Sequence, residues 1–84
     1  MIIPKKVEKA LNHHLEMEAA AVFNYLAVAA WCESEGLEGC AKFFRAQLYE
    51  EHVHFMKFFD YLNEVCKHAI VPAVKQPRNS FKDI

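Results

Sequence analysis

The sequence predicts an all-α fold in which two long helices pair antiparallel around a short turn. Two long stretches, about 4–35 and about 38–68, are almost free of Gly and Pro. Both stretches repeat apolar residues at intervals of three and four, the spacing of one helix face. Gly36 and Gly39 interrupt the chain between them. A link this short folds two long helices back on each other as a hairpin.

The first predicted helix begins near Pro4 and continues to about residue 35. Proline is tolerated in the first turn of a helix, where its missing N–H costs nothing, and the many alanines that follow favour a helix. Apolar residues spaced by four and three form a stripe along this helix: Leu11, Leu15, Val22, Tyr25, Ala29 and Cys32. The position that completes the stripe holds a carboxylate, Glu18.

The second predicted helix covers about 38–68 and is rich in aromatic residues. Its stripe is again spaced for a helix rather than a strand: Ala41, Phe44, Leu48, Phe55, Phe58, Leu62 and Val65. The position that completes it is Glu51. Each helix therefore places a carboxylate in the middle of its own apolar stripe.

The remaining residues, 69–84, predict an extended connection. They contain Pro72 and Pro77 and show little periodicity. Ser80 and Asp83 have the spacing of a helix start, which predicts that the segment leads into a helix the sequence does not contain. The chain then corresponds to the first half of a longer structure. The alternative is an ordinary frayed tail.

Length and composition narrow the class of protein. Residues 1–84 make one small domain, and 54% hydrophobic residues exclude a disordered chain. Ten basic and eleven acidic residues favour neither nucleic acid nor an anionic membrane as partner, and no stretch is long enough to span a membrane. Three cysteines without CxxC spacing argue against a disulfide scaffold, so we expect buried thiols, no signal peptide and a cytoplasmic protein.

The two stripe carboxylates are predicted to meet at one level of the hairpin. Glu51 and His54 are three residues apart and project to one side of their helix, and Glu18 lies within about one turn of the same level. Two buried, ionised carboxylates without a partner would cost several kcal/mol each, and neither stripe offers a Lys or Arg nearby. Oxygen ligands with an imidazole suit Fe(II), Mn(II) or Zn(II).

Each of these features has a simpler interpretation when taken alone. A glutamate on a helix stripe is commonly a partly exposed residue, and a Glu-x-x-His pattern arises often by chance. Their combination at matching height indicates a metal site. A glutamate from one helix with Glu-x-x-His from another is half of the ligand set of a carboxylate-bridged di-iron bundle, so two more helices are needed to complete it.

The sequence resembles the N-terminal half of a bacterial non-haem ferritin. The resemblance is carried by LNHHLEMEAAAVFNYLAVAAWCESEGLEGCAKFFRAQLYEEHVHFMKFFDYL and extends over nearly all of residues 4–84. It includes Ala30-Trp31-Cys32 before the turn, Glu38-Gly39 after it, and Ser80, Phe81 and Ile84 at the end. It implies half of a ferritin-like four-helix bundle, because chains of this family continue through two more long helices and a short fifth one.

The resemblance also implies roles for individual residues. Glu18 matches the terminal carboxylate on one iron, Glu51 the carboxylate that bridges both irons, and His54 the histidine on the first iron. Tyr25 matches the ferroxidase tyrosine near the bridge, although a tyrosine on the stripe is equally explained by packing. Glu50 matches a position that helps to hold a third iron in some bacterial ferritins. The remaining ligands of the second iron lie on helices absent from this sequence.

The function implied by the resemblance is iron storage. A ferroxidase centre would oxidise Fe(II) to Fe(III) with O2, and the ferric mineral would be stored in a homo-oligomeric cage of about 24 subunits. A companion fragment or a second copy would supply the missing helices. Haem is not expected, because His52 stands where haem-binding relatives carry methionine. His13, His14 and His68 match no ligand position and are expected to be solvated or to lie near helix ends.

Two other assemblies are compatible with the sequence. Two copies of a two-helix chain could form the bundle with the di-iron site on a two-fold axis, as in encapsulated ferritin-like proteins. Alternatively, the hairpin could be a non-catalytic helical module that docks through its aromatic residues. In every case two helices leave apolar surface uncovered, and we expect an exposed patch formed by Phe43, Phe44, Phe55, Phe58 and Phe59.

Overall fold

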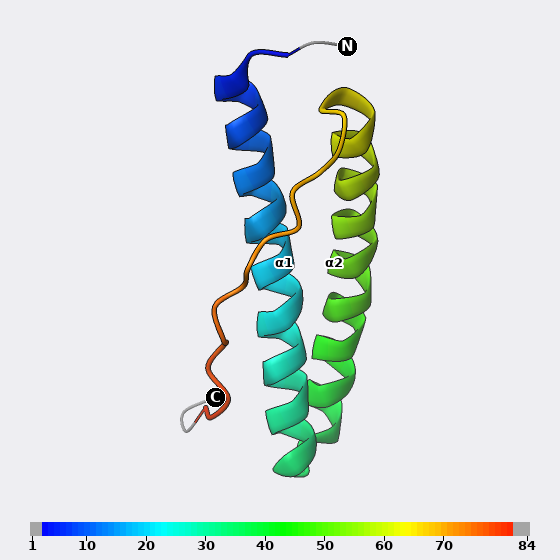
Figure 1. Ribbon diagram of the computed structural model, residues 1–84. Helices are drawn as coiled ribbons and strands as arrows, with labels where there is room; N and C mark the ends of the chain where they lie inside the picture. The colour runs from blue at the N-terminus through cyan, green and yellow to red at the C-terminus, as the bar shows by residue number, and fades with distance from the viewer. Residues whose placement is uncertain (1–2, 82–84) are drawn as a thin grey trace.

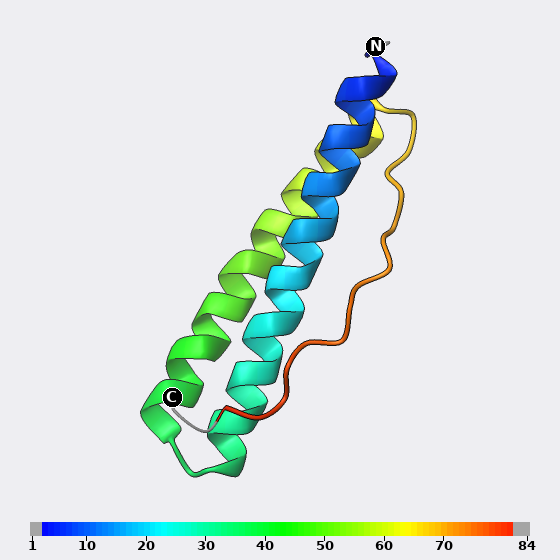
Figure 2. The ribbon, with the colours of Figure 1, turned by 90° about the vertical axis from the view of Figure 1, so that its left-hand side faces the viewer.

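The computed structural model describes residues 3–81 and contains two long helices. α1 spans Lys5–Ser34 and α2 spans Glu38–Val65. They run antiparallel, side by side along their full lengths (Figures 1 and 2). The pair is elongated, with principal extents of 50 × 20 × 15 Å. The predicted all-α hairpin is confirmed, and no strand occurs in the part of the chain that the structure describes.

The turn between the helices is closed by backbone hydrogen bonds that require a glycine. Gly36 has a φ of 71°, in the left-handed region. Its N–H donates to the Glu33 carbonyl at 3.2 Å, and the Leu37 N–H donates to the Cys32 carbonyl at 2.9 Å. These two bonds form the Schellman motif, which satisfies the last carbonyls of a helix and turns the chain sharply. Gly36 therefore sets the point at which α1 ends.

The core runs along the contact between the helices and follows the predicted stripes. Six stripe residues are buried: Leu15, Ala29, Cys32, Ala41, Leu62 and Val65. Leu15 and Leu62 have no exposed surface, and burying such a side chain contributes about 2 kcal/mol. Most larger stripe residues, such as Phe44 and Phe58, are only half-buried, because each helix is covered by the other on one side only. Ala19 and Ala27, outside the predicted stripe, are also buried.

α2 ends at Val65, earlier than the predicted limit of about 68. The Cys66 N–H makes a last helical bond to the Leu62 carbonyl at 2.8 Å. Lys67 then takes a left-handed φ of 68°, which cannot continue the helix. The sequence holds no Gly or Pro at this point, so the limit could not be placed from composition.

The segment after α2 is extended, as predicted, and runs back along α1 toward the turn (Figures 1 and 2). Two asparagine side chains hold its start: Asn63 Oδ1 accepts from the Ala69 N–H at 2.6 Å, and Asn12 Oδ1 accepts from the Ile70 N–H at 2.9 Å. At its far end, the Phe81 ring lies 5.9 Å from the Trp31 ring. The predicted helix start at 80–84 falls mostly outside the described residues.

Two expectations about exposure need correction. Cys32 and Cys66 are buried free thiols, but Cys40, in the first turn of α2, is an exposed free thiol. In the predicted aromatic patch, Phe43 is 57% exposed, whereas Phe55, Phe58 and Phe59 pack against the core beside Leu15 and Leu62. Neither α1 nor α2 is long and apolar enough to cross a membrane.

Candidate metal centre

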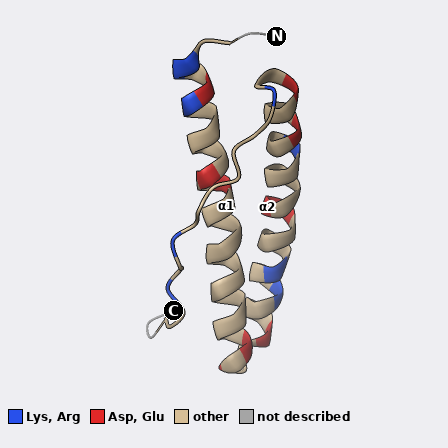
Figure 3. Ribbon diagram, viewed as in Figure 1, with Lys and Arg blue, Asp and Glu red and all other residues tan. Residues whose placement is uncertain are grey.

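Glu18 of α1 and Glu51 of α2 face each other across the middle of the helix pair. Both side chains are 20% exposed, unusually low for a carboxylate. Acidic residues lie midway along both helices, at similar heights, in Figure 3. The helical spacing that puts each glutamate on its apolar stripe brings the two together, because the stripes form the contact between the helices.

The two carboxyl groups are close enough for Glu18 to affect the ionisation of Glu51. Contact with Glu18, followed by burial, raises the pKa of Glu51, and the Glu18 charge adds to this effect. Two ionised carboxylates cannot hydrogen-bond, because neither has a proton to donate. Oε2 of Glu18 is buried and has no hydrogen-bond donor. A proton or a cation between the two groups would relieve their repulsion, and the raised pKa of Glu51 favours its protonated form when no cation is bound.

His54 lies at the edge of this carboxylate pair. Its Nδ1 is 4.0 Å from Oε2 of Glu51, and its side chain is 56% exposed. Its positive form would lower the pKa of Glu51, which opposes the larger effects of Glu18 and burial. The structure therefore brings His54 next to Glu51, as the Glu-x-x-His spacing predicts, but on the open side of the hairpin.

The other two predicted residues are placed differently. Tyr25 is half-buried on α1, two turns from Glu18, and its ring lies 6.3 Å from that of Phe44. Glu50 is exposed, and its charge makes a small contribution to the raised pKa of Glu51. Both residues lie on the same helices as the carboxylate pair, but neither forms part of it.

One residue at this centre was expected to be solvated. The Nε2 atom of His14 lies 3.1 Å from Oε1 of Glu18, one helical turn away on α1. The ring also meets Phe58 of α2 edge-on, with 4.6 Å between centroids. The four-residue spacing of His14 and Glu18 was the available signal, but such spacing is too common on helices to predict a contact alone.

The candidate centre takes its polar side chains from two helices, and His54 lies on its exposed side. Within residues 3–81, no three side chains of His, Cys, Asp or Glu are close enough to form a complete metal site. Two hard oxygen donors and an adjacent imidazole still fit one part of the coordination shell of Fe(II), Mn(II) or Zn(II). Such an arrangement binds a metal fully when further ligands cover its open side.

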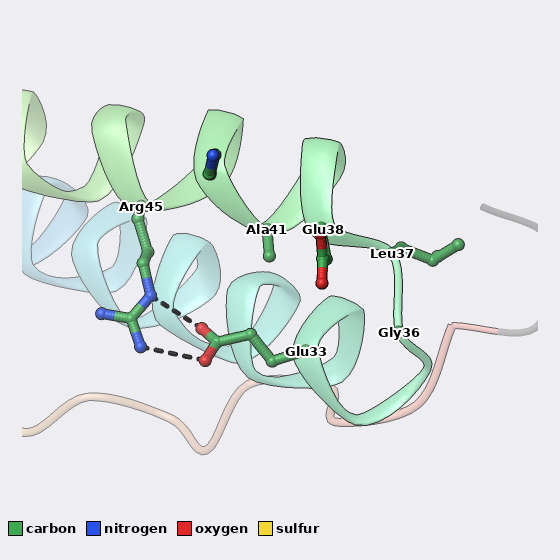
Figure 4. A pocket seen from close by; sticks show the side chains of 7 residues that line it. Glu33, Gly36, Leu37, Glu38, Ala41 and Arg45 are labelled. Atoms are coloured by element: carbon green, nitrogen blue, oxygen red, sulfur yellow. Dashed lines mark hydrogen bonds and ion pairs between the residues drawn. The ribbon is translucent and has the colours of Figure 1, made fainter.

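A hollow at the turn, about 520 Å³ in volume, is a second candidate site, and its charged lining residues are Glu33, Glu38, Lys42 and Arg45. It lies between the end of α1 and the start of α2 (Figure 4). Arg45 donates from Nε to Oε2 of Glu33 at 2.7 Å and from Nη2 to Oε1 at 3.1 Å. This two-bond pair lowers the pKa of Glu33 and raises that of Arg45. The two charges satisfy each other and join the helices.

The pattern that defines the ferritin-like domain matches residues 8–84, which is most of the chain. The chain belongs to the ferritin-like family. Within this family it is 36% identical, over 99% of its length, to the bacterial non-heme ferritin of Staphylococcus epidermidis. It is 35% identical to a probable bacterial non-heme ferritin-like protein of Haemophilus influenzae and 36% identical to the bacterial non-heme ferritin of Campylobacter jejuni.

Solved ferritin structures have the same hairpin. The chain superposes on Chlorobium tepidum ferritin with a TM-score of 0.89 at 38% identity, and on a humanized archaeal ferritin with 0.89 at 30%. In both cases 98% of this chain covers 50% of the solved chain. The chain likewise spans half the length of the curated relatives it matches. It is therefore similar to one half of a ferritin subunit.

Proposed function

We propose that this chain forms half of an iron-storage ferroxidase, with Fe(II) and O2 as its substrates. The single observation that supports this most is the partly buried carboxylate pair of Glu18 and Glu51, because Oε2 of Glu18 is buried and has no donor. A cation would supply the charge that this oxygen needs. Ferritin relatives that extend over the whole chain make iron the cation of choice.

Each residue has a proposed role at the centre. Glu51 lies between the helices and would bridge two irons, while Glu18 would bind one of them from α1. His54, on the open side next to Glu51, would add a nitrogen ligand to the first iron. Each Fe(II) would give one electron to O2, and the chain's contribution is to hold hard ligands in place with coordination positions left open for O2.

Two further residues have supporting roles in this proposal. Tyr25, half-buried two turns from Glu18, would hydrogen-bond near the bridge and supply an electron. Glu50, exposed beside Glu51, would hold a third iron as it leaves or enters the centre. Both assignments follow from the resemblance to ferritins.

The open side of the centre implies a partner that carries the remaining ligands. Two further helices, from a companion segment or a second copy, would cover the stripes and complete the four-helix bundle. We propose that the completed subunits form a homo-oligomeric cage, of about 24 copies as implied by the resemblance. His52 does not belong to this ligand set and lines an apolar hollow with Phe23, Phe55 and Val71.

The test is the rate of aerobic Fe(II) oxidation by the assembled protein. Glu51→Ala removes the bridging ligand and should slow oxidation at least about tenfold, since even losing the partner of a metal ligand commonly costs that much. Glu64→Ala is the matched control, because Glu64 is an exposed glutamate on the same helix. An unchanged rate in Glu51→Ala would rule out ferroxidase activity at this centre.

A further inference from the structure

The imidazole of His14 lies against the carboxylate of Glu18. Its Nε2 lies 3.1 Å from Oε1 of Glu18, and the pair is four residues apart on α1. A carboxylate oxygen can only accept, so a hydrogen bond across this distance would need the hydrogen on Nε2 of His14. The side chain of His14 is 50% exposed, so water reaches one side of the ring.

The ring of His14 is held in place from the opposite helix. Phe58 of α2 meets it edge-on, with 4.6 Å between ring centroids and 64° between ring planes. Aromatic pairs favour this geometry, and it restricts how the imidazole can turn. Glu18 thus has His14 of its own helix beside its carboxylate, and the His14 ring packs against Phe58 of the opposite helix.

The two oxygens of Glu18 consequently have different surroundings. Oε1 lies 3.1 Å from Nε2 of His14, while Oε2 is buried and has no donor. Oε2 is therefore the oxygen with a lone pair left for a metal ion. Metal-bound carboxylates are themselves commonly hydrogen-bonded through their other oxygen, which fixes their direction and tunes their strength.

We propose that His14 is a positioning residue of the metal centre, which holds Oε1 of Glu18 so that Oε2 is presented to the metal as a single-oxygen ligand. This inference rests on the proposed function of Glu18 as a metal ligand. His14 itself does not bind the metal, since its Nε2 is engaged with the carboxylate and its ring with Phe58. A change at His14 should thus alter metal affinity while leaving the ligands in place.

The test measures Co(II) binding to the assembled protein by visible absorption, with Co(II) as an air-stable substitute for Fe(II). His14→Phe keeps an aromatic ring against Phe58 but removes the donor, so the Co(II) Kd should rise about tenfold. His14→Gln keeps a donor that can reach one turn along the helix, so its Kd should stay within about threefold of the unmodified protein. His13→Phe, the same change at the neighbouring exposed histidine, should have no effect.

The outcomes separate this proposal from its rivals. Equal affinity of His14→Phe and the unmodified protein would show that the contact has no positioning role. A second rival is that His14 is itself a metal ligand. It would be supported if His14→Phe and His14→Gln lost the same Co(II) affinity and Co(II) shifted a second imidazole proton in the NMR spectrum, and this result would also overturn the proposal. If the unmodified protein does not bind Co(II), both the positioning role and the proposed function are overturned. If the unmodified protein binds Co(II) and His14→Phe has the same Kd, only the positioning role is overturned.

Discussion

Among single residues, Glu51 shows the unfavourable electrostatics of the centre most clearly. Its contact with Glu18 and its burial both make ionisation unfavourable, so its pKa in the folded protein is raised. A group that binds its proton more tightly when folded stabilises the folded state at low pH. That stabilisation is lost as the pH rises from the ordinary carboxyl value, about 4.3, through the raised value. A bound cation would remove this dependence by compensating the charge.

The metal-free protein should therefore become less stable as the pH rises above about 4.3. Glu51→Gln should flatten this part of the profile and raise the melting temperature near neutral pH, because an amide needs no proton to hydrogen-bond Glu18. Thermal melts in a chelator across this pH range would measure the effect, with Glu64→Gln as the exposed control on α2. A Glu51→Gln profile parallel to that of the unmodified protein would contradict the assigned cause.

The turn between α1 and α2 contains two glycines that have open space around them but different roles. Gly36 has a φ of 71°, whereas Gly39 lies in the first turn of α2. A Cβ at either position would meet no atom within 4 Å. The effect of adding a methyl group is thus set by the backbone conformation alone.

Replacing each glycine by alanine should change stability in opposite directions. Gly36→Ala should destabilise the protein by about 1 kcal/mol, because an L-residue is strained in the left-handed region. Gly39→Ala should stabilise it by about 0.5 kcal/mol, since alanine lowers the entropy of the unfolded chain and favours a helix. Urea unfolding of the two variants gives both values. A stabilising Gly36→Ala would mean that the Schellman geometry is not retained in solution.

Considered as a whole molecule, the hairpin leaves large apolar side chains uncovered. Phe43, Tyr49, Val53 and Met56 of α2 are each at least 40% exposed, as are Phe23 and Leu26 of α1. A folded monomer seldom keeps contiguous apolar surface on this scale. The hairpin is therefore expected to need further helices around it.

The 84-residue chain produced by itself should not behave as a folded monomer. We expect light scattering with size exclusion to give masses well above 9.7 kDa, or a poorly helical species by circular dichroism, because the exposed aromatic surface drives association. Addition of the missing two helices as a separate polypeptide should restore a discrete assembly. A helical monomer of 9.7 kDa would contradict the need for a partner.

Much of the candidate site follows from helical period alone. The stripes place Glu18 and Glu51 inside the hairpin because every third and fourth residue shares a face, and each of these side chains is only 20% exposed. The same reasoning predicts that His54 joins them but does not say how deep it lies. Depth depends on the distance and rotation between the helices, and His54 lies on the open side. The contact of His14 with Glu18 was missed for the same reason, since Phe58 fixes it from the other helix.

The sequence by itself determined the two helices, the turn at Gly36 and the pairing of two carboxylates, because hydrogen-bond period and glycine conformation act between near neighbours. Only the tertiary structure decided the course of the segment after α2. The Asn12 side chain bonds Ile70 across 58 residues of sequence, and no local pattern records a contact between such distant parts of the chain. The left-handed Lys67 ends α2 where the sequence has no glycine or proline to indicate a helix end.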